Sequence, residues 1–132
     1  MAPAPQEQPL PRRILIAEDE PHIRRVLATL LESASFQVDL ATDGREALDC
    51  LASPTEYVLV LTDLMMPHHS GLEVLEAIRD MGHRKDTPVV MLTAKGQDAD
   101  RDRALALGAR DFLTKPFSPK KLLARIHQLL GD

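Results

Sequence analysis

Four short, mostly apolar runs in this chain each end at polar residues with chemically useful side chains. The runs are Ile14–Ala17, Tyr57–Thr62, Val89–Leu92 and Asp111–Thr114. The polar residues that follow them are, in the same order, Glu18 with Asp19, then Asp63, Thr93 and Lys115. If the runs are parallel strands of one sheet, their carboxyl ends share one edge, which is where open α/β sheets bind ligands. Three carboxylates, a hydroxyl and an ammonium group would then meet in one crevice.

The segments between these runs have the spacing of helices. The first helix face, at i, i+3, i+4, i+7 and i+8, consists of Ile23, Val26, Leu27, Leu30 and Leu31. Phe36, Val38 and Leu40 alternate with polar residues, which predicts a further strand at an edge of the sheet. The sequence therefore predicts five β-α units, and right-handed crossovers would wind them into a doubly wound α/β fold with five parallel strands and five flanking helices.

Residues typical of helix ends support this division. Asp43 with Glu46, and Ser70 with Glu73, have the spacing of capping boxes. Gly108 suits the left-handed position after a polar helix of about residues 98–107. Prolines suited to the first turn of a helix are Pro21 and, after a capping Ser118, Pro119.

Composition limits the function classes. A chain of 132 residues with 44% hydrophobic and 27% charged residues suits one soluble domain. The net charge of -4 disfavours a dedicated nucleic-acid binder. Cys50 is the single cysteine, which we interpret as inert packing in a reducing compartment. Without an apolar span or secretory signal, we expect a cytoplasmic protein that does not enter membranes. Residues 1–12 are proline-rich and predict a flexible tail before a domain of residues 13–131.

The polar residues at the strand ends suggest phosphoryl chemistry. A carboxylate such as Asp63 can attack a phosphoryl group and form an aspartyl-phosphate. Glu18 and Asp19 can hold Mg²⁺, which takes oxygen ligands and neutralises phosphate charge. Lys115 offers a second positive charge, and Thr93 offers a hydroxyl donor. Each residue alone is better explained as a cap, a strand end or a solvated charge. Their convergence on four strand ends favours a site.

The segments ILIAEDEP, VLVLTDLMMP, VVMLTAK and GARDFLTKPFSP resemble the receiver domain of bacterial two-component response regulators. The resemblance spans about residues 13–130 and matches all the site positions named above. It implies the flavodoxin-like sheet order 2-1-3-4-5. It also implies a phosphoacceptor signalling domain, not an enzyme acting on external substrates, which promotes its own phosphorylation and slow autodephosphorylation. A downstream effector protein or an output domain would receive the signal.

The resemblance assigns a role to each residue of the site. Asp63 would take phosphate from the phosphohistidine of a sensor histidine kinase or phosphotransfer protein. Asp19, Asp63 and the backbone carbonyl of Met65 would hold Mg²⁺, with Glu18 acting largely through water. Lys115 would pair with the phosphoryl group. As switch residues, Thr93 would move toward the phosphoryl group while Phe112 repacks inward. The Lys115–Pro116 peptide bond is usually cis in such domains.

Rival functions fit the sequence less well. A haloacid-dehalogenase phosphatase needs a second aspartate two residues after the nucleophile, where this chain has Met65. A flavodoxin needs a phosphate loop after the first strand, where Glu18–Glu20 would repel phosphate. A degenerate receiver that only binds proteins is disfavoured by the intact site. His68 and His69 are more simply exposed loop residues than metal ligands, because no third ligand is evident.

Two further expectations concern lifetime and assembly. The resemblance implies two positions that flank attacking water, two residues after the aspartate and two after the threonine. Here they are Met65 and Lys95, which offer no carboxylate or amide, so the phosphoryl group should persist. The segment KPFSPKKLLARI resembles the winged-helix transcription-factor subfamily, whose receivers dimerise through charge pairs. Asp111 and Arg125 match one such pair, but Lys121 would oppose Arg101. We therefore expect a monomer or weak dimer. Whether the chain is a stand-alone regulator or part of a longer protein stays open.

Overall fold

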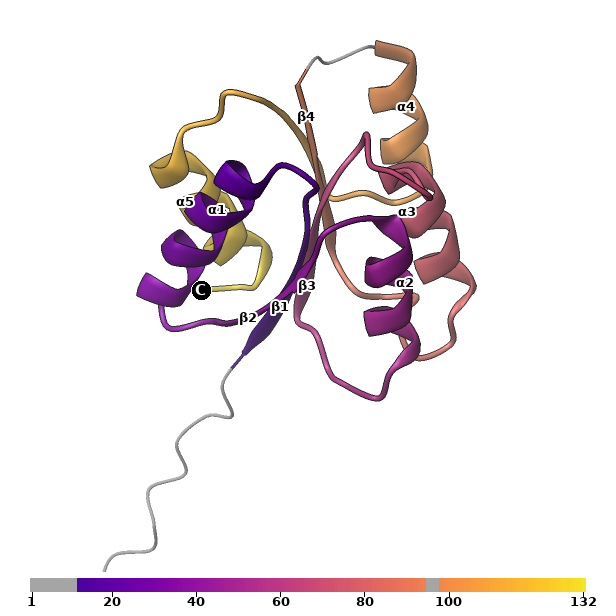
Figure 1. The fold of residues 1–132 in the computed structure, drawn as a ribbon, viewed down its shortest axis with the longest axis horizontal. Helices are drawn as coiled ribbons and strands as arrows, with labels where there is room; N and C mark the ends of the chain where they lie inside the picture. Colours follow the sequence, from indigo (N-terminus) through magenta and orange to yellow (C-terminus); the bar gives the residue numbers. More distant parts are fainter. Residues whose placement is uncertain (1–11, 95–97) are drawn as a thin grey trace, which may run out of the picture.

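The structure, a computed structural model, describes residues 12–94 and 98–132 of the chain. Strands and helices alternate along the described residues, as the sequence predicts (Figure 1). The strands are β1 Arg13–Ala17, β2 Gln37–Ala41, β3 Leu59–Asp63, β4 Val89–Thr93 and β5 Asp111–Thr114. The helices are α1 Pro21–Ser33, α2 Gly44–Ala52, α3 Gly71–Asp80, α4 Asp98–Ala106 and α5 Pro119–Leu129. None of these helices, within the described residues, is long and apolar enough to cross a membrane.

The strands form one parallel sheet in the order β2-β1-β3-β4-β5, which confirms the predicted fold. Helices α1 and α5 cover one face, and α2, α3 and α4 cover the other (Figure 1). Asp63 pairs with Leu92 and Thr93 pairs with Thr114, so these strands end at nearly the same level. The register therefore brings the polar strand ends to one edge of the sheet.

The core consists of two apolar clusters separated by the sheet. Leu15, Val60 and Met91 point toward α2, α3 and α4, whereas Ile16 and Leu61 point toward α1 and α5. Every residue of β3 and β4 is buried, as expected for parallel strands covered on both faces. The edge strand β2 is less buried, and its Leu40 is exposed.

Side chains cap the amino-terminal ends of four helices, but the hydrogen bonds differ in part from those that the sequence predicts. The predicted capping box of α3 is complete, with Ser70 and Glu73 each accepting from the other's backbone N–H. The box of α2 is half formed: Asp43 caps the helix, but Glu46 turns back to the N–H and hydroxyl of Thr42. The cap of α5 is the predicted serine, Ser118.

Two arginines hold loop carbonyls at the end of the sheet opposite the polar strand ends. Arg84 is buried, donates to the carbonyls of Leu51 and Ser53, and stacks over the ring of Tyr57. Arg79 donates to the carbonyls of Leu107 and Gly108 after α4 and to those of Lys85 and Thr87 before β4. These contacts satisfy polar backbone groups that lie outside regular structure.

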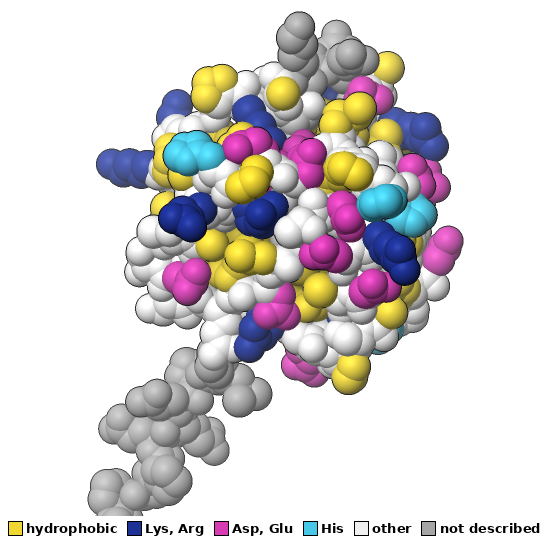
Figure 2. All heavy atoms as spheres, in the orientation of Figure 1, with side chains coloured by type: hydrophobic (Ala, Val, Ile, Leu, Met, Phe, Trp, Pro, Cys, Tyr) yellow, Lys and Arg dark blue, Asp and Glu magenta, His cyan; other side chains and the backbone are white. Residues whose placement is uncertain are grey.

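Arg12, the first described residue, is hydrogen-bonded to Asp132, the last. Its guanidinium forms two hydrogen bonds with the carboxylate of Asp132 and lies 4.9 Å from the ring centroid of Phe36. Residues 1–11 of the predicted tail lie outside the described residues. On the face drawn in Figure 2, acidic side chains lie across the middle with lysine and arginine side chains among them.

Candidate functional site

The polar residues predicted at the strand ends do converge. Carboxylate oxygens of Glu18, Asp19 and Asp63 all lie within 4.8 Å of one another, and among the described residues this is the one such cluster able to hold a metal ion. Glu18 is fully buried and Asp63 is 6% exposed, whereas Asp19 faces solvent. Three carboxylates this close repel one another unless a cation lies between them.

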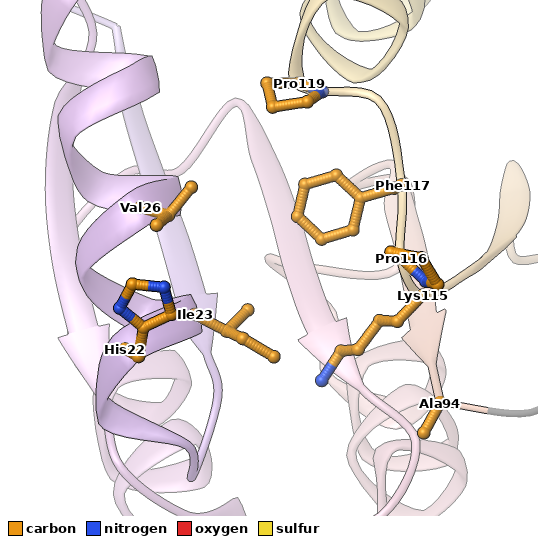
Figure 3. A pocket seen from close by; sticks show the side chains of 8 residues that line it. All are labelled: His22, Ile23, Val26, Ala94, Lys115, Pro116, Phe117 and Pro119. Carbon is orange, nitrogen blue, oxygen red and sulfur yellow. The ribbon is translucent and has the colours of Figure 1, made fainter.

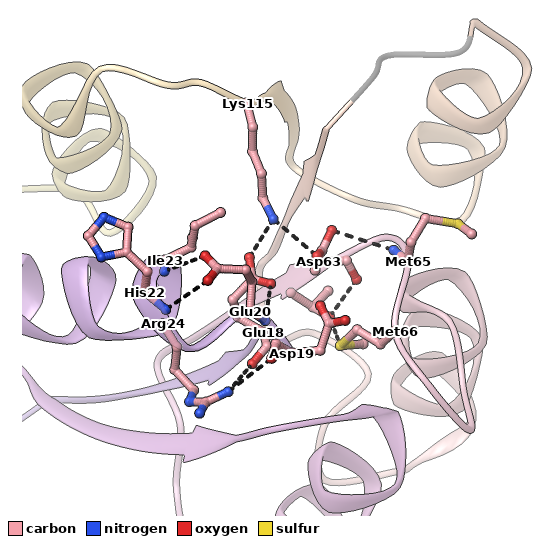
Figure 4. A network of polar contacts seen from close by, with 11 residues as sticks. Glu18, Asp19, Glu20, His22, Ile23, Arg24, Asp63, Met65, Met66 and Lys115 are labelled. Carbon is pink, nitrogen blue, oxygen red and sulfur yellow. Dashed lines mark hydrogen bonds and ion pairs between the residues drawn. The ribbon is translucent and has the colours of Figure 1, made fainter.

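Lys115 reaches across the site and contacts two of the three carboxylates (Figure 4). Its Nζ lies 2.5 Å from Oε1 of Glu18 and 3.1 Å from Oδ2 of Asp63. The backbone N–H of Lys115 donates to the carbonyl of Thr93 at 2.6 Å, which holds the lysine beside the end of β4. The Lys115–Pro116 bond is cis, as the family resemblance implies.

Burial and charge shift the titration of both partners. Burial raises the pKa of Glu18 to about 7, with Asp63 adding to the rise and the hydrogen bond from Lys115 opposing it. Burial lowers the pKa of Lys115, but its hydrogen bonds to Glu18 and Asp63 outweigh this, so the net shift is upward. Lys115 is therefore a stable cation, while Glu18 depends on positive neighbours to stay ionised.

The two expected switch residues lie on the neighbouring strands β4 and β5. Thr93 is the last residue of β4 and is 2% exposed, and its backbone carbonyl accepts from the N–H of Lys115. Phe112 lies in β5 and is partly buried. It packs against the apolar core cluster on the face of the sheet that α2, α3 and α4 cover. Within the pairing of these two strands, Phe112 is the partner of Met91, and Thr93 is the partner of Thr114.

The loop from β3 to α3 forms another wall. The Met65 side chain is 69% exposed, and its N–H lies 3.5 Å from Oδ1 of Asp63. His68 has a left-handed backbone with φ of 71° and lies 3.7 Å from Asp43. His69 contacts Glu73 at 3.0 Å. His68 is thus close to the carboxylate that caps α2, His69 contacts a carboxylate of α3, and neither joins the candidate metal cluster.

Two residues of the site were missed by the sequence interpretation. Glu20 is the cap of α1, because its carboxylate accepts from the N–H groups of His22 and Ile23. Glutamate is not among the preferred capping residues, so its residue type alone does not indicate this role. Arg24 donates to the backbone carbonyls of Glu18 and Asp19 (Figure 4). Its position one turn into an amphipathic helix gave no signal of this contact.

An apolar groove of about 420 Å³ opens beside Lys115 (Figure 3). One wall is formed by α1, with Ile23 and Val26, and the other by the segment after β5, with Pro116 and Phe117. The approach to the carboxylate cluster from this side is therefore largely hydrophobic.

Comparison with known proteins agrees with this geometry. The sequence profile of the response regulator receiver domain matches residues 14–127. The chain belongs to the response regulator receiver domain family. This receiver domain is 42% identical over 117 residues to the transcriptional regulatory protein SrrA of Staphylococcus aureus. The match covers 89% of the receiver domain chain and 47% of SrrA, so the chain spans about half the length of these relatives.

Solved receiver domains have the same fold. The chemotaxis response regulator CheY4 of Vibrio cholerae superposes on this receiver domain with a TM-score of 0.82 at 32% identity, covering 90% of this chain and 98% of that one. The receiver domain of the sensor histidine kinase PA1611 from Pseudomonas aeruginosa superposes with a TM-score of 0.83 at 30% identity, covering 92% and 99%. That structure contains a magnesium ion coordinated in its active-site cleft.

Proposed function

We propose that this receiver domain accepts a phosphoryl group on Asp63, with Mg²⁺ as its cofactor. One observation carries the proposal: the carboxylates of Glu18, Asp19 and Asp63 converge at a sheet edge where Lys115 already contacts Asp63. Structural caps would not need to converge in this way. A site for a charged phosphoryl group needs both a carboxylate nucleophile and cations around it.

The reaction would be an in-line displacement at phosphorus. A carboxylate oxygen of Asp63 forms the new O–P bond, while the P–N bond of a phosphohistidine breaks and the imidazole nitrogen leaves with the electron pair. Bound Mg²⁺ would neutralise charge on the transferring oxygens. Asp19, Asp63 and the Met65 carbonyl would hold this ion, with Glu18 acting through water. Oxygen donors of this kind are the ligands that Mg²⁺ prefers.

Lys115 would serve as the second cation. Its Nζ is 3.1 Å from Asp63, so it is within hydrogen-bond reach of an oxygen on a phosphoryl group attached there. Moving its contact from Glu18 to that oxygen would release a carboxylate whose ionised form depends on a positive neighbour. Thr93 and Phe112 would follow, because added negative charge favours the arrangement that places donors around it.

The phosphate source and the receiver of the signal follow from the family. We assign phosphorylation to a sensor histidine kinase or phosphotransfer protein, and slow loss of phosphate to hydrolysis at Asp63. The output would be a downstream effector, or an output domain on the same polypeptide. The second form is supported by SrrA, a transcriptional regulatory protein of which this chain spans less than half.

Phosphorylation by a small donor tests the proposal without the natural kinase. Acetyl phosphate with Mg²⁺ should add one phosphoryl group to the protein, and peptide mapping should place it on Asp63. Asp63→Asn should remove the modification, and EDTA should prevent it. Asp49→Asn is the matched control, because Asp49 is an exposed aspartate on α2 outside the cluster. Undiminished modification of Asp63→Asn would overturn the proposal.

A further inference from the structure

We propose that Arg24 is a positioning residue that sets the acidic loop between β1 and α1 in its metal-binding conformation. The inference rests on the proposed function, because it concerns how the same site holds Mg²⁺. Arg24 does not touch the carboxylates through its guanidinium. It acts through the backbone of the residues that carry them.

The contacts of Arg24 link helix α1 to the loop that precedes it. Its Nη1 donates to the backbone carbonyl of Glu18 at 2.9 Å and approaches that of Asp19 at 3.4 Å (Figure 4). Its own backbone N–H donates to the carbonyl of Glu20 at 3.0 Å. The guanidinium therefore contacts two members of the acidic loop, and the backbone contact to the third is the ordinary first hydrogen bond of α1.

The other restraints on the loop act mainly on its two ends, apart from one hydrogen bond within it, from the N–H of Glu20 to Oε2 of Glu18 at 3.1 Å. The N–H of Glu18 donates to the carbonyl of Ala41 in β2, but β1 has ended one residue earlier, and the Glu18 carbonyl has left the ladder. Glu20 is fixed through its cap of α1. Between them, Asp19 is exposed, and Arg24 contacts the carbonyls of the two peptide groups that flank it, at 2.9 and 3.4 Å. A half-buried guanidinium between two carbonyls is a strong, geometrically defined restraint.

The positive charge of Arg24 and its positioning contacts should have opposite effects on Mg²⁺ affinity, so an experiment can distinguish the two roles. Arg24 is a cation near the site, and its charge alone would weaken Mg²⁺ binding. Removing a bystander charge should therefore tighten binding. Removing a positioning contact should weaken it, because the Asp19 carboxylate would no longer be held in place before the ion arrives.

The test compares three variants in the full chain by Mg²⁺ titration, followed through the backbone amide resonances of Asp19 and Glu20. We expect Arg24→Met to weaken Mg²⁺ binding by about tenfold, the lower end of the effect of removing groups that orient metal ligands. Arg24→Lys, which keeps a donor and the charge, should restore most of the affinity. Arg25→Met is the matched control: it removes the same charge from an exposed neighbour on the same helix.

A second readout reports the loop directly. Without Mg²⁺, the amides of Asp19 and Glu20 should exchange with solvent faster in Arg24→Met than in the wild type or in Arg25→Met. Thermal unfolding is followed separately. Arg24→Leu, which also removes the donor, replaces the methionine variant with the same expectation if the latter does not fold.

Mg²⁺ affinity in Arg24→Met equal to or tighter than that of the wild type would overturn the role of Arg24. Wild-type protein that showed no response to Mg²⁺ would refute the metal site of the proposed function, and the positioning role with it.

Discussion

Burial of Glu18 in the site affects the free energy of unfolding of the protein. Its carboxylate is fully buried, its pKa is raised to about 7 by burial, and its partner is Lys115 at 2.5 Å. Because the folded state binds this proton more tightly than the unfolded chain, the contribution of Glu18 to the free energy of unfolding falls as the pH rises toward 7. Burying this carboxylate beside Asp63 therefore lowers the stability of the folded protein as the pH approaches 7.

Asp19→Asn should change Mg²⁺ affinity and stability in opposite directions. The substitution should lower Mg²⁺ affinity at least about tenfold, because it removes an anionic ligand. In EDTA it should also raise the free energy of unfolding by a few tenths to about 1 kcal/mol, because repulsion from Glu18 and Asp63 is relieved at an exposed position. Magnesium titration and urea unfolding measure the two quantities. Asp49→Asn should change neither, and a substituted protein with unaltered Mg²⁺ affinity would exclude Asp19 as a ligand.

Met65 should lengthen the life of the phosphorylated state. Its side chain is 69% exposed beside Asp63 and offers no group to orient an attacking water molecule. We expect Met65→Asn to shorten the lifetime about tenfold, which corresponds to about 1.4 kcal/mol in the barrier. Met65→Leu, which stays apolar, should leave it unchanged. Loss of phosphate from the acetyl-phosphate-labelled protein measures this, and a wild-type lifetime of only seconds would contradict it. Lys95, the other expected flanking residue, lies outside the described residues.

At the level of elements, local sequence patterns predict strands and helices well and their end contacts less well. Strand β4 could be predicted from its apolar run alone. A parallel strand that is buried on both faces is apolar along almost its whole length. The cap of α1 was not predicted, because glutamate is not a preferred capping residue, although the Glu20 carboxylate accepts from the N–H groups of His22 and Ile23. Glu46 left its expected partner because Thr42 offers both an N–H and a hydroxyl.

The face made by α4, β5 and α5 should not form a tight symmetric dimer on phosphorylation. Arg125 already donates to Asp111 within one chain at 2.8 Å, which leaves this pair less free for a partner. Arg101 and Lys121 are exposed on α4 and α5, and their apposition across a two-fold axis would be repulsive. Counted twice, replacing attraction by repulsion costs about 2 kcal/mol or more.

Sedimentation of the protein activated with beryllofluoride would measure this. We expect a mostly monomeric species at low micromolar concentration, and Lys121→Glu should shift it toward a dimer. Lys120→Glu, at an exposed neighbouring position on α5, is the control for the change in net charge. A dimer of the unsubstituted protein at that concentration would contradict the prediction.

Across the whole molecule, the sequence could predict the members of the site but not all of their contacts. Asp63 and Lys115 were identifiable because parallel strands bring their carboxyl ends to one edge whatever the loops do. The salt bridge between Lys115 and Glu18 joins residues 97 positions apart and depends on side-chain conformation in the folded state. The carbonyl contacts of Arg24 and Arg84 were invisible for the same reason, since any long cation on a helix or loop has the same local pattern.

The two ends of the sheet should therefore respond differently to substitution. Arg84 lies between α3 and β4, at the end opposite Asp63, where it is 3% exposed and satisfies two carbonyls. Arg84→Met should lower the free energy of unfolding by about 2–4 kcal/mol, because buried carbonyls lose a charged donor and the stack on Tyr57 is lost. Mg²⁺ affinity and labelling of Asp63 should stay as in the wild type while the protein remains folded. Urea unfolding and magnesium titration of the same samples measure both properties.

Lys85→Met, an exposed neighbour, should leave stability within about 0.5 kcal/mol of the wild type. A loss of Mg²⁺ affinity in folded Arg84→Met would show that the two ends are coupled through the sheet, and would contradict this division.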